Sequence, residues 1–521
     1  MQQSITLRVR PSESTNEFLL RQYAALAAGR ALDDVTGFHI EKKSVDARSK
    51  QVWINLTLKV FIQEPFFERS IQQTVYRDTH KALQKVIIIG GGPSGLFAAL
   101  KLIEEGIQPV ILERGKDVRA RRRDLAALNK DGVINPDSNY CFGEGGAGTY
   151  SDGKLYTRSN KRGDINKILN LFVQFGAEEN ILFEAHPHIG TNKLPQIITN
   201  IRQQILSCGG VFLFNERVVD LVVQDNHIMG VKTAGGSIHE GGSVILATGH
   251  SARDVFQLLC TKNILIEFKP FALGVRVEHP QQLIDSIQYH CSIREEHLAA
   301  ASYSLVQQVN GKGVFSFCMC PGGIIACAAT NVGEIVVNGW SPSKRNNPYA
   351  NSGIVVTVDE QDLGPLYMKH GPLAGMYFQQ SVEQRAYTIG GGALVAPAQR
   401  MTDFVNSKAS QNLPGSSYIP GLRPASLNDV LPDFISNRLR QAFTGFGKKM
   451  KGYMTNEAVL VATESRTSST VRIPRHLHNL QHPQIKNLYP CGEGAGYAGG
   501  IISAAMDGEH VAKAIIQTLK G

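Results

Sequence analysis

A glycine-rich turn with G-x-G-x-x-G spacing offers the clearest chemistry in the sequence. It directly follows a β-branched apolar run over residues 86–89 and precedes a helical pattern over residues 94–105. In such a unit the first glycine permits a tight turn, the second lets the backbone approach a pyrophosphate, and the third allows close helix–strand packing. The helix N-terminus would present free N–H groups and the positive end of its dipole to the phosphates. We therefore expect a dinucleotide to contact Gly90, Gly92, Pro93, Ser94 and Gly95.

An acidic residue closes the same unit. A second apolar run over residues 109–112 ends in Glu113, about 20 residues beyond the glycines, where a carboxylate accepts hydrogen bonds from a ribose. Strand, glycines, helix, strand and acid in this order favour dinucleotide binding over an ordinary glycine-rich turn. The neighbouring Arg114 could flank an adenine ring, whereas residues 119–123 are expected to form a solvated helix face. We expect Glu113→Ala to weaken binding and scarcely to alter the fold.

A second glycine-rich segment, residues 141–154, contains five glycines in fourteen residues. Such density suits a backbone that passes close to a flat or phosphorylated ligand, often with positive φ. A flexible linker would not interleave hydroxyl, aromatic and acidic groups with the glycines. We expect a cofactor-contacting loop whose binding residues are Gly145, Gly146, Gly148, Thr149, Ser151, Asp152 and Gly153.

Two further segments are assigned to the same nucleotide. A strand over residues 243–246 leads into Ala-Thr-Gly, where small residues let the backbone pass under a cofactor, and Val218 opens an edge strand as a backbone contact for adenine. Near the C-terminus a short strand over residues 487–490 precedes a glycine-rich turn, and a helix begins near residue 500. The expected contacts are Thr248, Gly249, Gly492, Glu493, Gly499, Gly500 and Ile501.

Catalytic residues cannot be assigned from the sequence, and the candidates for a cleft are Glu464 and Arg466. These charged groups stand among hydroxyl-bearing residues, which is unusual chemistry for a core strand. The alternative is a structural ion pair between the two. Cys318, Cys320 and Cys327 could form a metal or redox cluster, but their spacing matches no zinc pattern, and core packing of small thiols is favoured. We therefore expect no metal site.

Composition limits the class of protein. The 521 residues can bury a large core, and the net charge of +9 suits anionic ligands without by itself indicating nucleic acid. The eight cysteines are scattered and form no C-x-x-C pair, which indicates reduced thiols and a cytoplasmic location. No signal-peptide pattern and no membrane span is expected.

The order of the patterns predicts a discontinuous organisation. Residues 1–80 show a β-α-β-β order typical of a small α+β domain with one helix on an antiparallel sheet. A Rossmann-like α/β domain is expected over residues 81–255 and 475–521, with a β-rich substrate or cap domain inserted over 256–474. Between two N-terminal strands lie Lys42, Lys43, Arg48 and Lys50. These form either a solvated hairpin end or a site for an anionic partner.

Several segments together resemble a known family. They are KKSVDAR (42–48), CFGEGGAGTYSDGKL (141–155), FSFCMCPGG (315–323), ESRTSSTVRIPR (464–475) and YPCGEGAGYAGGI (489–501). With them the chain resembles FAD-dependent oxidoreductases of the glutathione-reductase-like superfamily and, more narrowly, a family of uncharacterised bacterial FAD-dependent dehydrogenases.

The resemblance implies an extended FAD, with the adenosine near Glu113 and Val218 and the isoalloxazine near Gly145 and Gly500. Glu493 would contact the ribityl hydroxyls, in a position where the superfamily often has the shorter aspartate. No histidine or cysteine stands in an evident attachment context, so FAD is expected to be non-covalent.

The leading hypothesis is an FAD-dependent oxidoreductase that transfers hydride through flavin N5 on an unidentified small-molecule substrate. One dinucleotide unit is evident, so NAD(P)H would be a transient electron donor. Two alternatives stay open: a flavoprotein that binds or modifies RNA through its basic N-terminal domain, and a non-catalytic flavin-binding interaction protein. The substrate and any protein partner of the N-terminal domain stay open as well.

Overall fold

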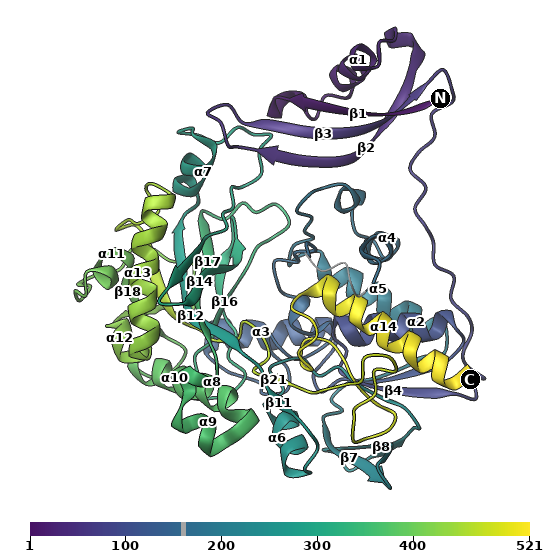
Figure 1. Cartoon of the computed structure of the whole chain (residues 1–521), viewed down its shortest axis with the longest axis vertical. Helices are drawn as coiled ribbons and strands as arrows, with labels where there is room; N and C mark the ends of the chain where they lie inside the picture. The colour runs from purple at the N-terminus through teal and green to yellow at the C-terminus, as the bar shows by residue number, and fades with distance from the viewer. Residues whose placement is uncertain (158–162, 521) are drawn as a thin grey trace.

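The computed structural model combines an α/β core with two β-rich parts (Figure 1). The expected fold class is confirmed: an α/β Rossmann-like part, a β-rich part with a mixed sheet, and an N-terminal α+β part. The structure describes residues 1–157 and 163–520. The proposed domain limits at residues 80, 255 and 475 stay predictions, and residues 158–162 and 521 inside those domains lie outside the described part.

The Rossmann-like part consists of a parallel sheet, a smaller antiparallel sheet and helices. Its elements are β4 (Lys85–Ile89), α2 (Pro93–Glu104), β5 (Gln108–Leu112), α3 (Val118–Asp131), α4 (Ile165–Gln174), α5 (Leu194–Ser207), β6 (Val211–Leu213), β7 (Val218–Gln224), β8 (His227–Thr233), β9 (Ile238–Glu240), β10 (Val244–Leu246), α6 (Arg253–Thr261), β22 (Leu488–Pro490) and α14 (Ile501–Lys520). The parallel strands have the order β22-β10-β4-β5-β6.

Strand β4 is apolar throughout its buried length because both faces of the sheet are covered. Val86 and Ile88 pack in a cluster with residues of α2, α4, α5 and α14. Ile87 and Ile89 pack on the opposite face with residues of β7, β8 and α6. The alternation of the four side chains between two cores explains why the sequence shows a continuous apolar run there.

The carboxyl ends of the parallel strands position the candidate site. Strand β4 leads into the glycine turn, β5 ends before Glu113, β10 ends shortly before Thr248, and β22 ends shortly before Gly492. Since parallel strands share one carboxyl edge, loops that are far apart in the sequence meet there. Open α/β sheets bind their ligands in the crevice at this edge.

The β-rich part is built on a seven-stranded mixed sheet. Its strands are β12 (Phe271–Pro280), β13 (Val306–Val309), β14 (Lys312–Cys320), β17 (Tyr349–Val358), β18 (Ala396–Arg400), β19 (Leu422–Pro424) and β20 (Val459–Glu464), in the order β13-β14-β17-β12-β20-β18-β19. Two small ribbons are β15 (Ile324–Cys327) with β16 (Val337–Trp340), and β11 (Glu267–Phe268) with β21 (Val471–Arg472). The helices are α7 (Gln281–Tyr289), α8 (Glu360–Leu363), α9 (Pro365–His370), α10 (Ala374–Gly390), α11 (Met401–Val405), α12 (Leu427–Val430) and α13 (Asp433–Lys449).

The N-terminal part has the expected β-α-β-β order. Its elements are β1 (Gln2–Val9), α1 (Glu17–Ala28), β2 (Val35–Asp46) and β3 (Trp53–Ile62), and the antiparallel strand order is β1-β3-β2. Helix α1 ends at Ala28 because Gly29 adopts a left-handed φ of 63° as its C-cap. Residues 63–84 then run along the outside of the molecule to β4 (Figure 1).

No helix within residues 1–157 and 163–520 has the length and apolar character that a membrane span requires. In the same residues, no group of three or more His, Cys, Asp or Glu side chains could hold a metal ion. All eight cysteines are free thiols.

Candidate functional site

A pocket lies at the carboxyl edge of the parallel sheet, and all four expected loops line it. The sequence-predicted residues on its wall are Gly90, Gly92, Pro93, Ser94, Glu113, Arg114, Gly146, Gly148, Ser151, Asp152, Gly153, Val218, Thr248, Gly249, Glu493, Gly499, Gly500 and Ile501. Four others lie behind the wall: Gly95, Gly145, Thr149 and Gly492. The structure thus brings the predicted segments together, and their contacts with a cofactor stay predictions.

The glycines behind the wall are required by packing. A Cβ atom on Gly95 would lie 2.0 Å from the backbone oxygen of Gly90, and one on Gly492 would lie 2.2 Å from Oγ of Ser94. Gly145 has a left-handed φ of 77°, and its Cβ would lie 2.0 Å from Oγ1 of Thr149. The Thr149 hydroxyl donates to the backbone oxygen of Glu144 at 2.8 Å. These residues shape the loops that line the pocket.

Two pocket glycines have no packing reason of this kind. A Cβ on Gly499 or Gly500 would meet no protein atom within 4 Å, and neither residue has a left-handed φ. Both are exposed to the pocket immediately before helix α14. The space beside them is therefore free for a ligand, which fits an extended dinucleotide that passes close to the backbone.

Two helices point their N-termini at the pocket. Pro93 and Ser94 start α2, and Ile501 starts α14, and all three residues line the wall. No side chain caps the N-terminus of α2, where Gly92 is the N-cap residue. The free N–H groups and the positive dipole ends at both places suit an anionic ligand.

Glu113 holds three backbone segments in place. Its buried carboxylate accepts hydrogen bonds from the N–H groups of Gly91 and Gly115 at 2.8 Å each and from Gly143 at 3.0 Å. One side chain thus links the glycine turn to the residues after β5 and to the second glycine-rich loop. The expectation that its loss would scarcely alter the fold is therefore revised.

The arginines after Glu113 differ in their surroundings. Arg114 lies on the pocket wall, with its guanidinium 4.1 Å from the ring centre of Phe142 and ion pairs to Asp137 and Asp254. The expectation of a solvated face over residues 119–123 is wrong for Arg121. This side chain is fully buried, and it donates to backbone oxygens of residues 139, 140 and 144. It fixes the approach to the second glycine-rich loop.

Comparisons with known proteins agree with this geometry. Residues 84–125 match a family model described as "FAD binding domain", and residues 270–467 match "FAD-dependent protein, C-terminal domain-like". Residues 1–61 match a "Domain of unknown function". An "Uncharacterized protein" of Clostridium beijerinckii is 38% identical over 503 residues, which cover 93% of this chain and 93% of that protein. The chain belongs to the family of this clostridial protein. It is an FAD-dependent protein with an FAD-binding domain.

Solved structures match the chain only distantly. L-proline dehydrogenase from P. horikoshii has a TM-score of 0.33 and 11% identity, with 85% of this chain and 95% of that chain covered. Glycine oxidase from Bacillus cereus has a TM-score of 0.31 and 14% identity, with 84% and 95% covered. At these scores neither structure supports an inference about the reaction of the FAD-dependent protein described here.

The two cleft candidates lie at different depths. Arg466 lines the pocket, but its guanidinium is held by Glu383 at 3.0 Å and Glu334 at 3.1 Å. Glu464 borders a smaller adjoining cavity and accepts a hydrogen bond from Nη1 of Arg276 at 2.9 Å. The alternative in which Glu464 and Arg466 pair with each other is therefore wrong.

Burial and charge shift the pKa values of three carboxyls near the pocket. Burial raises the pKa of Glu464 to about 7, and Arg276 only partly offsets this. Burial also acts on Glu383, but the positive charges of Arg253 and Arg466 outweigh it and lower the pKa to about 2. For Asp152 the cations of Lys154 and Arg345 likewise overcome burial, and the pKa is about 2.

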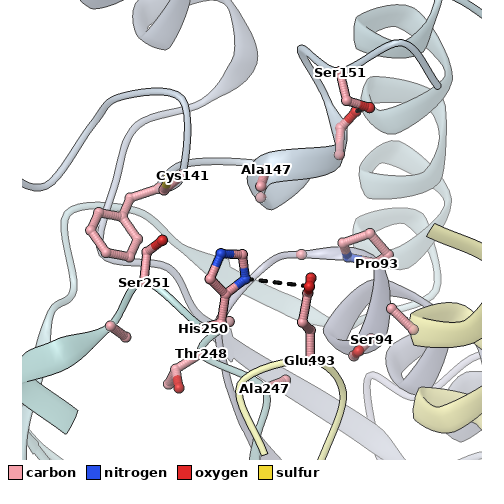
Figure 2. Close-up of a pocket in the computed structure, with 18 of the residues that line it drawn as sticks. Pro93, Ser94, Cys141, Ala147, Ser151, Ala247, Thr248, His250, Ser251 and Glu493 are labelled. Atoms are coloured by element: carbon pink, nitrogen blue, oxygen red, sulfur yellow. Dashed lines mark hydrogen bonds and ion pairs between the residues drawn. The ribbon is translucent and has the colours of Figure 1, made fainter. Parts of the chain in front are cut away.

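Sequence reasoning missed several residues that line the pocket. His250 lies with Nδ1 3.5 Å from the carboxylate of Glu493, and Figure 2 shows the two side chains directed at each other. Lys154, Cys318 and Asn338 also line this wall. His250 directly follows the Thr-Gly pair after β10, and Lys154 directly follows Gly153. Their position next to predicted cofactor contacts is the feature of the sequence that could have identified them.

Proposed function

We propose that the protein is an FAD-dependent oxidoreductase that acts on a small molecule, with FAD bound non-covalently in the pocket at the carboxyl edge of the parallel sheet. The observation that carries the proposal is that four predicted loops converge on this pocket. Beside Gly499 and Gly500 the pocket has open space for a ligand, because no protein atom lies within 4 Å of a Cβ built on either residue. A cytoplasmic location is part of the proposal, since all eight cysteines are free thiols.

The residues divide the proposed site into two ends. Glu113, Arg114 and Val218 would hold the adenosine, and the N-terminus of α2 would hold the pyrophosphate. Gly148 and the N-terminus of α14 would lie beside the isoalloxazine. Bound FAD would supply hydride transfer through N5, with NAD(P)H as a transient donor.

Beyond the flavin end, polar side chains would face the substrate. His250 can hold a proton on Nδ1 toward the carboxylate of Glu493, which orients the imidazole ring. Arg466 contributes less free charge because Glu334 and Glu383 already engage its guanidinium. We therefore place His250 ahead of Glu464 and Arg466 as the side chain that handles a substrate proton.

Two measurements test the cofactor. The purified protein should carry FAD that is released by acid precipitation, and flavin that stays with the pellet would reject non-covalent binding. Gly500→Val should raise the dissociation constant for FAD roughly tenfold or more, because the new side chain fills ligand space. Gly242→Val is the matched control, since its Cβ also meets no atom within 4 Å and it lies outside the pocket. Equal FAD affinity in both variants would contradict the proposed pose.

Photoreduction of the holoprotein tests the reaction. An oxidoreductase should pass electrons from the reduced flavin to at least one of oxygen, a quinone or NAD(P)⁺ faster than free FADH₂ does. Reoxidation no faster than that of free flavin with every acceptor would favour the non-catalytic alternative.

The RNA-binding alternative gains no specific support from the N-terminal part. The guanidinium of Arg48 makes two hydrogen bonds to Asp46 at 2.8 Å each. The backbone of Lys43 pairs with residues 183–185 of the Rossmann-like part. Of the four residues in the basic cluster, Arg48 thus has an acidic side-chain partner, and Lys43 is held through its backbone.

A further inference from the structure

Cys318 is a pocket residue whose role the flavin site does not explain. It lies near the end of β14 and lines the wall beside Phe317 and Asn338. The pairing of β14 with β17 is irregular between Phe317 and Cys320, and Cys318 has a left-handed φ of 44°. This backbone conformation is rare for a residue with a side chain. It sets Cys318, half-buried, on the pocket wall, whereas Cys320 is fully buried.

Two cations surround the pair of cysteines. Nζ of Lys154 lies 3.7 Å from Sγ of Cys318 and 3.9 Å from Sγ of Cys320. Nη2 of Arg276 lies 3.5 Å from Sγ of Cys320 and donates to the backbone oxygen of Cys318 at 2.7 Å. Lys154 comes from the second glycine-rich loop and Arg276 from β12, so distant segments place two cations beside the thiols. Each cation also pairs with a carboxylate, Lys154 with Asp152 at 3.6 Å and Arg276 with Glu464 at 2.9 Å.

The local charges favour a thiolate on Cys318. The neighbouring Cys320 thiol, by hydrogen bonding, lowers the pKa of Cys318 well below its usual range, and Lys154 and Arg276 act in the same direction against burial and Asp152. The carboxyl of Glu464 on β20 also faces this group. Burial and the Cys318 sulfur raise the pKa of Cys320, so the second thiol keeps its proton. A thiolate that a ligand can reach beside cations is the form in which cysteine is a nucleophile, and half-buried Cys318 on the pocket wall meets this condition.

We propose that Cys318 is the nucleophile of a thiol–disulfide exchange site, with Cys320 as the resolving thiol and a small disulfide entering the pocket as the substrate class. This activity adds to the proposed oxidoreductase function and does not require the flavin to react. We propose no metal at these cysteines.

The exchange balances in two steps. The Cys318 thiolate attacks one sulfur of the substrate disulfide and forms a sulfur–sulfur bond with it. The disulfide bond of the substrate breaks, and its electron pair leaves with the first product thiolate. Sγ of Cys320 then attacks Sγ of Cys318, the mixed disulfide breaks, and the Cys320 proton passes to the second leaving thiolate. The protein dithiol is oxidised by two electrons, and the disulfide is reduced to one thiolate and one thiol, the thiolate then taking its proton from solvent.

The test uses the purified full-length protein with 5,5′-dithiobis(2-nitrobenzoate) as the disulfide, with products located by peptide mass spectrometry. At pH 6 ordinary thiols of pKa about 8.5 are almost fully protonated and react slowly. Cys318 should be modified first at this pH, and a Cys318–Cys320 disulfide should accumulate. Faster modification of another cysteine at pH 6, or a stable mixed disulfide on Cys318, would overturn the proposal.

Variants separate this chemistry from simple exposure. Cys320→Ser should trap the mixed disulfide on Cys318. Lys154→Gln should slow formation of this mixed disulfide roughly three- to tenfold at pH 7, because less of Cys318 is then thiolate, although the thiolate that remains is more nucleophilic. Cys141→Ser is the matched control, because Cys141 lines the same pocket but its sulfur contacts the Ala328 oxygen at 3.9 Å and not a lysine. An unchanged rate in correctly folded Lys154→Gln, checked by circular dichroism, would overturn the role of the lysine.

Discussion

At the scale of single residues, Glu113 shows how one side chain serves both fold and site. Its carboxylate lies on the pocket wall where a ribose is expected, and it accepts three backbone N–H groups. Two of these donors, Gly91 and Gly143, belong to loops that are separate in the sequence. A residue that contacts the ligand can therefore also hold the neighbouring loops in the conformation that forms the site.

Glu113→Ala is expected to lower both FAD affinity and thermal stability. Hydrogen bonds to a charged group are worth about 1.5–3 kcal/mol, which corresponds to roughly a ten- to a hundredfold change in the dissociation constant. FAD titration of the apoprotein and its melting temperature measure the two effects. Glu216→Ala is the control, because Glu216 lines the same pocket and its carboxylate pairs with His239 at 3.8 Å. A Glu113→Ala apoprotein with normal melting temperature would show that the backbone contacts do not stabilise the loops.

At the scale of elements, an ion-pair network joins the Rossmann-like part to the β-rich part. Arg253 on α6 pairs with Glu383 on α10 at 2.9 Å, and Arg466 after β20 pairs with the same carboxylate at 3.0 Å. Glu334 pairs with both arginines. These side chains are almost fully buried, so the charges must compensate each other.

Arg466→Met is expected to destabilise the protein more than it slows flavin reduction by a substrate. Removing one partner of a buried ion pair typically costs about 3–5 kcal/mol because the remaining charge stays buried. The melting temperature of the holoprotein and the rate of flavin reduction distinguish a structural from a substrate-orienting role. Arg385→Met is the control, because Arg385 lies on α10, the helix that carries Glu383, and is exposed. Slow reduction with a normal melting temperature would instead support the original cleft assignment.

The same network predicts an acid transition. The pKa of Glu383 is about 2 in the folded protein, below its ordinary value of 4.5. Its stabilising contribution is therefore fully present above pH 4.5 and is lost as the pH falls from 4.5 toward 2. Melting temperatures across this range should fall less steeply in Glu383→Gln, whose starting stability is lower. If the melting temperatures of the two proteins fell equally steeply with pH, Glu383 would not be the cause of the acid transition.

At the scale of the whole molecule, the N-terminal part docks through the edge of its sheet. Strand β2 is an edge strand, and the Lys43 N–H donates to the Phe183 oxygen at 2.8 Å while its oxygen accepts from the Ala185 N–H at 2.9 Å. The guanidinium of Arg69 also lies 5.8 Å from the ring centre of Phe183. No residue of this part lines the main pocket. Its contribution is therefore expected to concern assembly of the molecule and not cofactor binding.

Lys43→Pro should loosen this docking without changing FAD affinity. Proline removes the N–H donor, and an edge strand otherwise tolerates it. Limited proteolysis should cleave the segment over residues 63–84 faster than in the unmodified protein. Val45→Pro is the control, because Val45 lies two residues further along β2 and shows no hydrogen bond to residues 183–185. Equal cleavage of both variants would mean that the Lys43 contact does not hold the N-terminal part.

The sequence alone determined the features that depend on neighbouring residues. Strand β4, its glycine turn and helix α2 follow from apolar periodicity and glycine spacing, and the β-α-β-β order of the N-terminal part follows from local alternation. The pocket loops were also recognisable. Three of them follow the ends of β4, β10 and β22 and carry small residues there, and the fourth, over residues 141–154, is marked by its five glycines. The confirmed fold class rests on these local rules.

The tertiary structure decided which charged groups are buried and with which partners. Glu464 pairs with Arg276, which is 188 residues away, and Lys154 lies beside Cys318, which is 164 residues away. Arg121 is buried although it stands in an arginine-rich run that local composition marks as solvated. The physical reason is that burial and charge compensation depend on what packs against a side chain from another element, and spacing along one segment carries no information about that partner.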